Sequence, residues 1–191
     1  MRVIAGSVRR MCLEVAPGSP TRPFLEKTRG ALFNSLAAAL PRAMVLDLYA
    51  GSGALGIEAL SRGAAGCVFV ERDAAALRVL EGNVRRCGFE KRSRVLRGDA
   101  GAVAARLKGA FNLIFVDPPF PDAADWSGGG GIREIALETS RMLVPGGVLV
   151  FRLEGDVPCP ASWGGLPLIR ENCYGRSRLC RYGVAGEPEN G

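Results

Sequence analysis

From residue 43 onward, short apolar runs alternate with segments of helical periodicity, and this alternation constrains the fold more than any other feature. The first run, Met44–Tyr49, is followed at once by a glycine-rich turn, Ala50–Gly56, and a helical segment that reaches Arg62. An apolar run without a polar face is typical of a buried parallel strand. Strands that alternate with helices predict a mostly parallel sheet with helices on both faces.

The same pattern continues to residue 151 and predicts the remaining elements. We expect four further strands, at Gly66–Val70, Arg94–Leu96, Phe111–Val116 and Val148–Phe151. The predicted helices between them cover Ala74–Cys87, Gly101–Lys108 and Ile132–Leu143, and Pro145-Gly146-Gly147 is a stop signal after the last one.

The C-terminal part predicts a different arrangement. Leu166–Ile169 and Arg178–Tyr182 flank a turn near Tyr174-Gly175, which is typical of a β-hairpin. We expect this hairpin to be partly antiparallel to the sheet, which would then have about seven strands. Residues 186–191 form a tail after the last predicted strand.

The first 42 residues read as an extension of this domain. Residues 2–15 alternate loosely in hydrophobicity around Gly6-Ser7 and predict a β-hairpin. Phe24–Leu40 has helical periodicity and is followed by Pro41. We therefore expect an N-terminal hairpin and helix extension over residues 1–42 and a main domain over residues 43–185.

Composition bounds the class of protein and its compartment. The 191 residues are 48% hydrophobic and 23% charged, which fits one globular domain. No apolar run reaches the roughly 20 residues of a membrane span, and the N-terminus lacks the apolar core of a signal peptide, so we expect a cytoplasmic protein. The six cysteines form no C-x-x-C pair, which argues against a disulfide framework and favours reduced thiols. Because the chain has no histidine, His-based triads and His-ligated metal sites are excluded, and we expect no metal.

The charge of the chain is concentrated near its N-terminus. Residues 1–42 hold seven Lys or Arg against two Glu, whereas the rest holds 18 basic against 17 acidic residues. This imbalance favours a polyanionic partner, and the alternative is an ordinary solvated surface. The candidate phosphate contacts are Arg2, Arg9, Arg10, Arg22, Lys27 and Arg29. For a second basic cluster, the preference for cations at a helix C-terminus is the stronger explanation; its residues are Arg85, Arg86, Lys91, Arg92, Arg94 and Arg97.

The glycine turn carries the first chemical signal. Gly51, Gly53 and Gly56 spell G-x-G-x-x-G between a strand and a helix, which is the context of a nucleotide-binding loop. Glu71 lies 20 positions after Gly51 and ends the next strand, where an acid can bind ribose hydroxyls.

Two further acids favour one kind of cofactor. Asp47 precedes the glycine loop, where a negative charge would oppose a pyrophosphate but favour an ammonium or sulfonium. Asp99 follows the third strand and could accept a hydrogen bond from an adenine amine. These features predict S-adenosylmethionine, with S-adenosylhomocysteine as product. The candidate cofactor-binding residues are Asp47, Tyr49, Ala50, Gly51, Ser52, Gly53, Glu71, Arg72, Asp99 and Ala100.

The second chemical signal is the sequence Asp117-Pro118-Pro119-Phe120, which follows the strand at Phe111–Val116. Two prolines cannot continue a central strand, so an acid, two rigid rings and an aromatic side chain should lie at its carboxyl end. That end is where open α/β sheets bind ligands. An acceptor beside an aromatic ring suits a planar group that carries an amine, and the alternative is a simple strand cap. These four are the candidate catalytic residues.

The order of these motifs resembles the class I S-adenosylmethionine-dependent methyltransferases, whose sheet is Rossmann-like. D-P-P-F is similar to the signature of enzymes that methylate exocyclic amines. The resemblance is closer still to the RsmD-type 16S rRNA guanine-N2 methyltransferases, and it covers nearly the whole chain. The stretches that carry it are residues 2–6, Thr21-Arg22-Pro23, Arg29–Asn34, Val45–Gly56, Glu58–Ala64, Asp117–Phe120 and Tyr174-Gly175.

The resemblance implies methyl transfer to N2 of a guanine in 16S rRNA of the small ribosomal subunit. We expect the basic extension to contact the RNA, and we take a monomer as the default because the sequence is silent on oligomeric state. In that mechanism the Asp117 carboxylate and the Pro118 carbonyl would orient the amine, and Phe120 would stack on the base.

Some residues depart from the family pattern, and several other functions stay open. Phe24 replaces a small hydroxyl residue, Asn172 replaces a common lysine, and Gly128–Gly131 add an unusual glycine loop. The alternatives are an amino-methyltransferase that acts on another RNA, DNA or a protein glutamine, an NAD-binding oxidoreductase, and an inactive RNA-binding module.

Overall fold

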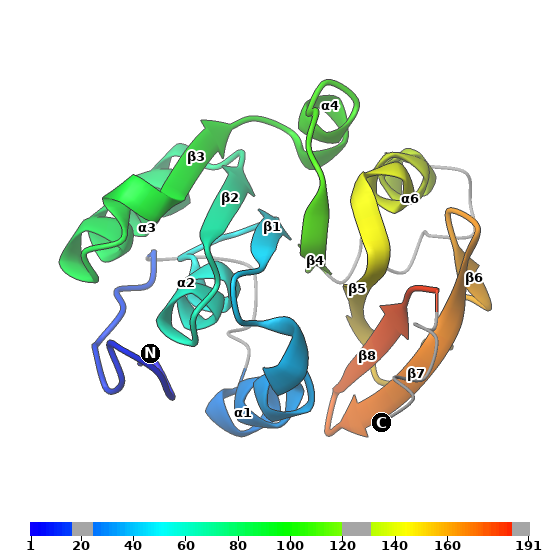
Figure 1. Cartoon of the computed structure of the whole chain (residues 1–191), viewed down its shortest axis with the longest axis horizontal. Helices are drawn as coiled ribbons and strands as arrows, with labels where there is room; N and C mark the ends of the chain where they lie inside the picture. The colour runs from blue at the N-terminus through cyan, green and yellow to red at the C-terminus, as the bar shows by residue number, and fades with distance from the viewer. Residues whose placement is uncertain (17–24, 120–130, 185–191) are drawn as a thin grey trace.

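The computed structural model describes residues 1–16, 25–119 and 131–184, and its strands form one sheet (Figure 1). The strands are β1 (Met44–Leu48), β2 (Gly66–Glu71), β3 (Ser93–Arg97), β4 (Phe111–Val116), β5 (Leu143–Glu154), β6 (Ser162–Trp163), β7 (Leu166–Tyr174) and β8 (Ser177–Tyr182). Their order in the sheet is β3-β2-β1-β4-β5-β8-β7-β6. The first five strands in this order pair in parallel, and the last three join antiparallel. The predicted architecture is confirmed, with the short strand β6 added to the expected set.

Helices cover both faces of the sheet, as the alternation predicts. They are α1 (Glu26–Ser35), α2 (Ala54–Ser61), α3 (Ala74–Arg86), α4 (Ala100–Ala104) and α6 (Gly131–Met142), with short 3₁₀ turns at Ala37–Ala39 and Glu90–Arg92. Successive residues of a strand point to opposite faces, so Val45 joins the core beneath α1, α2 and α3, whereas Leu46 joins the core beneath α4 and α6 (Figure 1). The sheet therefore separates two apolar layers.

The N-terminal segment is packed into the first of these layers. Its predicted hairpin forms one antiparallel bridge, Arg2 with Cys12, and Val3 and Leu13 are buried in the same core as β1. The single helix expected over Phe24–Leu40 is wrong in extent, because α1 ends at Ser35 and a 3₁₀ turn follows.

Two other predicted elements differ in length from those observed. The helix expected over Gly101–Lys108 is the shorter α4. The strand expected at Val148–Phe151 is the much longer β5, which includes Pro145-Gly146-Gly147. A register shift against β4 accommodates these three residues, since Phe111 pairs with Leu143 but Leu113 pairs with Val148.

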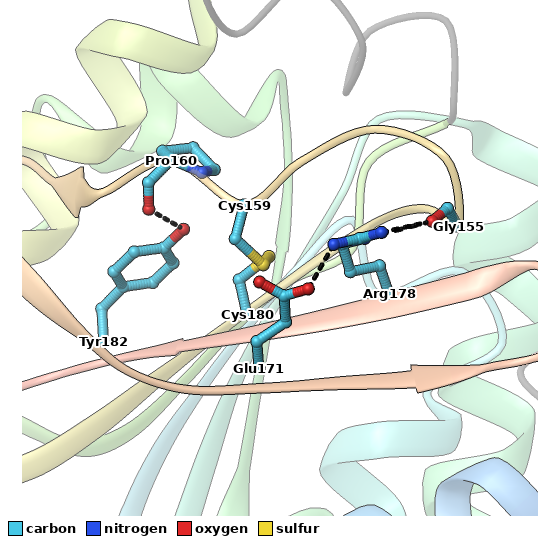
Figure 2. The surroundings of a disulfide bond; sticks show 7 residues. All are labelled: Gly155, Cys159, Pro160, Glu171, Arg178, Cys180 and Tyr182. Carbon is cyan, nitrogen blue, oxygen red and sulfur yellow. Dashed lines mark hydrogen bonds and ion pairs between the residues drawn. A yellow bond between two sulfur atoms is a disulfide. The ribbon is translucent and has the colours of Figure 1, made fainter.

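The expectation of reduced thiols is wrong for one pair of cysteines. Cys159 and Cys180 form a disulfide with a Cα–Cα distance of 5.7 Å, which joins the connection after β5 to β8 (Figure 2). Around it, Tyr182 donates a hydrogen bond to the Pro160 carbonyl, and Arg178 bonds the Gly155 carbonyl. Sequence spacing gave no sign of this bridge, because only the antiparallel return of β8 along β5 brings the two cysteines together. Cys12, Cys67, Cys87 and Cys173 are free thiols.

Within the described ranges, none of the helices combines the length and the apolar character needed to cross a bilayer. The same ranges contain no group of three or more His, Cys, Asp or Glu side chains that could hold a metal ion.

Candidate functional site

The glycine turn after β1 forms a loop with an unusual backbone. Tyr49, Gly51 and Gly53 have positive φ angles of 63°, 54° and 83°. A Cβ on Gly53 would lie 2.4 Å from the Leu80 side chain, so this position is closed on its inner side. A Cβ on Gly51 would meet nothing within 4 Å. The loop is therefore packed below and open at Gly51, which leaves room for a ligand against the backbone.

Two acids at the carboxyl ends of β2 and β3, Glu71 and Asp99, accept hydrogen bonds from nearby backbone amides. Glu71, at the end of β2, accepts hydrogen bonds from the N–H of Gly51 and of Asp73, each at 2.8 Å. Asp99 follows β3, is exposed, and accepts from the N–H of Gly101 at 3.0 Å as the N-cap of α4. The structure thus brings the predicted residues after β1, β2 and β3 to one edge of the sheet.

Asp47 behaves differently from the prediction. Its side chain is 1% exposed and lies beneath the loop, where Oδ2 accepts a hydrogen bond of 2.9 Å from the Gly56 N–H. Burial raises the pKa of Asp47 to about 8, the Gly56 amide opposes this rise, and the Asp117 and Glu71 carboxylates add to it. A carboxyl group with this pKa is mostly neutral at pH 7. This raised pKa weakens the argument that the charge of Asp47 repels a pyrophosphate, and the observed contact supports the loop.

Asn83, which the sequence analysis did not select, also holds the loop. This buried side chain on α3 donates hydrogen bonds to the carbonyls of Ser52 (2.9 Å) and Glu14 (3.0 Å) and accepts one from the Glu14 N–H. It therefore ties the glycine turn to the N-terminal segment. The sequence did hold a sign of this role, because Asn83 shares the buried face of α3 with apolar residues, and a buried amide needs hydrogen-bond partners.

Asp117 lies at the carboxyl end of β4 and faces Arg152 on β5. The register pairs Val116 with Phe151, so the next residue on each strand is Asp117 and Arg152. Arg152 Nε lies 2.6 Å from Asp117 Oδ1, and both side chains are largely covered. The N–H is not aligned for a hydrogen bond, so the contact is a close ion pair. Burial raises the pKa of Asp117, and the Arg152 guanidinium opposes this rise.

Arg152 was also missed, although the sequence held a signal. It interrupts the otherwise apolar run Val148–Leu153. A cation inside a buried strand needs a partner, and the strand order brings Asp117 beside it. Pro118 and Pro119 follow Asp117 as predicted, whereas Phe120 lies outside the described residues.

Four of the predicted RNA-binding residues lie around one hollow between the N-terminal segment and α1. This hollow has a volume of about 600 Å³, and its lining includes Arg2, Arg9, Arg10 and Lys27. Arg2 also pairs with Glu26 at 3.0 Å. Arg22 lies outside the described residues.

Arg29 does not belong to this surface, and its prediction as an RNA contact is corrected. Its side chain is fully buried, its Nε lies 4.0 Å from Glu58, and its guanidinium donates to the Arg2 carbonyl. Burial lowers the pKa of Arg29. Arg29 shares the buried stripe of α1 with Leu32 and Phe33, so helical spacing could have revealed its position.

The second basic cluster is partly engaged within the protein. Arg86 pairs with Glu14, and Arg92 donates to the Ala64 carbonyl at 3.1 Å and lies over the Phe89 ring. These three contacts favour the structural explanation for Arg86 and Arg92.

A parallel sheet whose carboxyl edge carries a glycine loop after β1, an acid after β2 and Asp-Pro-Pro after β4 defines the class of α/β methyltransferases. The chain belongs to the RsmD-type methyltransferase family: the family model described as "Conserved hypothetical protein 95" matches residues 1–183. Ribosomal RNA small subunit methyltransferase D of Escherichia coli is 40% identical over 200 residues, which cover 99% of this chain and 93% of that protein.

Other relatives also match this chain over most of their length. Ribosomal RNA small subunit methyltransferase D of Haemophilus influenzae is 32% identical over 183 residues and matches 92% of this chain and 89% of its own. The solved structure of yhhF from Escherichia coli superposes with a TM-score of 0.83 at 31% identity, over 98% of this chain and 99% of that one. TTHA0928 from Thermus thermophilus has a TM-score of 0.79 at 29% identity, over 96% and 99%.

Proposed function

We propose that this protein transfers a methyl group from S-adenosylmethionine to the exocyclic N2 amine of a guanine in 16S rRNA. The observation that carries the proposal is Asp117, an acid held beside Arg152 at the carboxyl end of β4 and followed by two rigid prolines. The activity named for the Escherichia coli relative, on small-subunit rRNA, supports the choice of substrate.

The residues that follow β1, β2 and β3 form the glycine part of the carboxyl edge, called the glycine edge below, and they fit S-adenosylmethionine. The open side of Gly51 allows close approach to the loop over Tyr49–Gly53, and Glu71 retains acceptor capacity for ribose hydroxyls besides its two amide contacts. Exposed Asp99, with Ala100 beside it, can accept from an adenine amine, and exposed Arg72 borders the same edge. Asp47 contributes indirectly, because it fixes the Gly56 amide below the loop. When bound, S-adenosylmethionine supplies a methyl group that its sulfonium already activates.

The acceptor end of the site orients and polarises the amine. The lone pair of guanine N2 is delocalised into the ring, so the amine is a poor nucleophile. The Asp117 carboxylate and the Pro118 carbonyl accept hydrogen bonds from its two N–H groups and stabilise the positive charge that develops on nitrogen as the new N–C bond forms. The Asp117 carboxylate then accepts the proton that the methylated amine must lose. Phe120 is proposed to stack on the base, which must leave its helical context to enter the site.

RNA affinity is proposed to come from the basic hollow beside α1. Arg2, Arg9, Arg10 and Lys27 line it, and Arg22 is the further candidate in the same segment. Contacts to phosphate release counterions, so binding should weaken steeply as salt concentration rises. A monomer in the cytoplasm stays a prediction, which sedimentation of the purified protein and cell fractionation can test.

The direct test is transfer of a labelled methyl group. The purified protein is incubated with labelled S-adenosylmethionine and either small-subunit particles or naked 16S rRNA, and the modified nucleotide is mapped. We expect one N2-methylguanine in the 16S rRNA. Label in DNA, in protein or at another base position would contradict the proposed substrate. Stabilisation by NAD rather than by S-adenosylhomocysteine in a thermal-shift measurement would contradict the proposed cofactor.

A further inference from the structure

Two acidic side chains lie on or directly after the neighbouring strands β1 and β4, and their surroundings differ. Asp47 comes from β1 and Asp117 follows β4, and the Asp117 carboxylate adds to the raised pKa of Asp47. Asp47 contacts the neutral Gly56 N–H, whereas Asp117 contacts the Arg152 guanidinium. Two neighbouring carboxylates in a covered site do not both ionise readily, and the one that has a cation beside it keeps the charge.

Arg152 is placed rigidly for this contact. Its strand, β5, is held on both sides, because it pairs in parallel with β4 and antiparallel with β8. On the β8 side, Arg152 is the register partner of Leu179. Its side chain is 5% exposed, and Asp117 is 18% exposed. The ion pair uses Nε and Oδ1, so the second carboxylate oxygen of Asp117 is not engaged in that contact.

We propose that Arg152 is a positioning residue that assigns the negative charge of this acidic pair to Asp117 and fixes one of its oxygens, so that the other can accept the substrate amine. This inference rests on the proposed function, because it gives Asp117 the role of amine acceptor. The described charged groups that face Asp117 are Arg152 from β5 and Asp47 from β1. Arg152 itself touches neither the substrate amine nor the methyl group in this mechanism.

The test compares pH profiles of methyl transfer for the wild type, Arg152→Met and Arg152→Lys. The active form of Asp117 is the carboxylate, so activity falls as pH drops through its pKa. Without the cation that pKa rises, and the acid limb of Arg152→Met should move by about one pH unit or more to higher pH. The kcat of Arg152→Met near neutral pH should fall about tenfold or more below that of the wild type, and the difference should be smaller at high pH. Its affinity for S-adenosylhomocysteine should be unchanged. Arg152→Lys keeps a cation beside Asp117, so its acid limb should lie close to the pH of the wild-type limb.

Matched controls separate this role from a structural one. Arg141→Met removes a cation from the exposed Arg141–Glu138 pair on α6 and should leave the profile unchanged. Asp117→Asn in the Arg152→Met background should abolish the shifted limb. An equal loss of activity at every pH, or a limb that does not move, would overturn the inference.

A second measurement keeps the inference testable if the proposed substrate is wrong. Carbon-13 labelling of the aspartate carboxyl groups reports the titration of Asp117 and Asp47 by NMR without any substrate, with Asp117→Asn and Asp47→Asn for assignment. Asp117 should titrate well below Asp47 in the wild type, and the gap should narrow in Arg152→Met. An unchanged gap refutes the inference alone, whereas failure of the wild type to methylate guanine in rRNA refutes the proposed function alone. If Arg152→Met does not fold, Arg152→Lys and Arg152→Gln supply the same comparison.

Discussion

The glycine edge and the end of β4 lie along the same carboxyl edge of the sheet, and both carry acids, but they hold these acids in different ways. At the glycine edge, Glu71, Asp99 and Asp47 accept hydrogen bonds from backbone amides of nearby loops. At the end of β4, Asp117 is paired with the Arg152 side chain from β5. Acids bonded to amides shape a loop, whereas an acid bonded to a buried cation retains its charge. The first arrangement suits binding of a ligand, and the second suits stabilisation of a developing positive charge.

The largest expected effect is the loss of methyl transfer in Asp117→Ala. This variant lacks the carboxylate that stabilises the positive charge developing on the substrate nitrogen. Its kcat should therefore fall by about 10²–10³-fold. Affinity for S-adenosylhomocysteine, measured by calorimetry, should change little because the glycine edge is intact. Loss of cofactor affinity in this variant would mean that the cofactor part and the Asp117 part of the site are not separable.

The next effect tests the contrast between buried and exposed arginines of the basic extension. Arg29→Met leaves the Arg2 carbonyl without its donor and removes a buried partner of Glu58, so the free energy of unfolding should fall by about 3 kcal/mol. Arg9→Met, at an exposed position, should change stability by less than about 0.5 kcal/mol. Arg9→Met should instead reduce the salt slope of RNA binding by about one. Denaturant unfolding and filter binding at several salt concentrations give both quantities, and the reverse pattern would restore Arg29 as an RNA contact.

A third prediction concerns the two loop glycines. Gly53→Ala combines a positive φ with a Cβ that would lie 2.4 Å from Leu80, so it should cost about 2 kcal/mol of stability and weaken cofactor binding. Gly51→Ala has a positive φ but no neighbour within 4 Å, so it should cost about 1 kcal/mol and act mainly on the cofactor. Thermal unfolding with and without S-adenosylhomocysteine measures both effects. Equal destabilisation by the two substitutions would show that packing below the loop is unimportant.

The smallest effect on methyl transfer at pH 7 should come from Asp47→Asn, because the wild-type side chain is mostly neutral at that pH and the amide oxygen can still accept from the Gly56 N–H. The pH dependence is more informative. Since the folded pKa of about 8 exceeds the unfolded value of about 3.9, Asp47 favours the folded state below the lower value, and this contribution is lost as pH rises toward 8. The slope is at most about 1.4 kcal/mol per pH unit. Asp47→Asn should flatten the fall in stability between those pH values, and an unaltered curve would contradict the raised pKa.

Local patterns predicted most of the fold and the residues of the glycine edge. A strand, a glycine turn and a helix follow one another within a few residues, and the acid after each strand is read directly from the sequence. The order of the parallel strands then brings these acids to one edge, because carboxyl ends of parallel strands share that edge. The positions of Glu71, Asp99 and Asp117 needed nothing more.

Contacts between distant segments were not predicted. Arg152 meets Asp117 only because β5 is inserted beside β4, and Cys159 meets Cys180 only because β8 returns along β5. Arg29 looked like one more surface cation until its position under the N-terminal segment was known.

The sequence by itself therefore determined which groups lie at the carboxyl edge of the sheet, since the periods of helices and strands fix the face on which each side chain lies. Tertiary structure decided which of those groups stays charged. Ionisation depends on burial and on the nearest partner, and both are set by strands that lie far apart in the sequence.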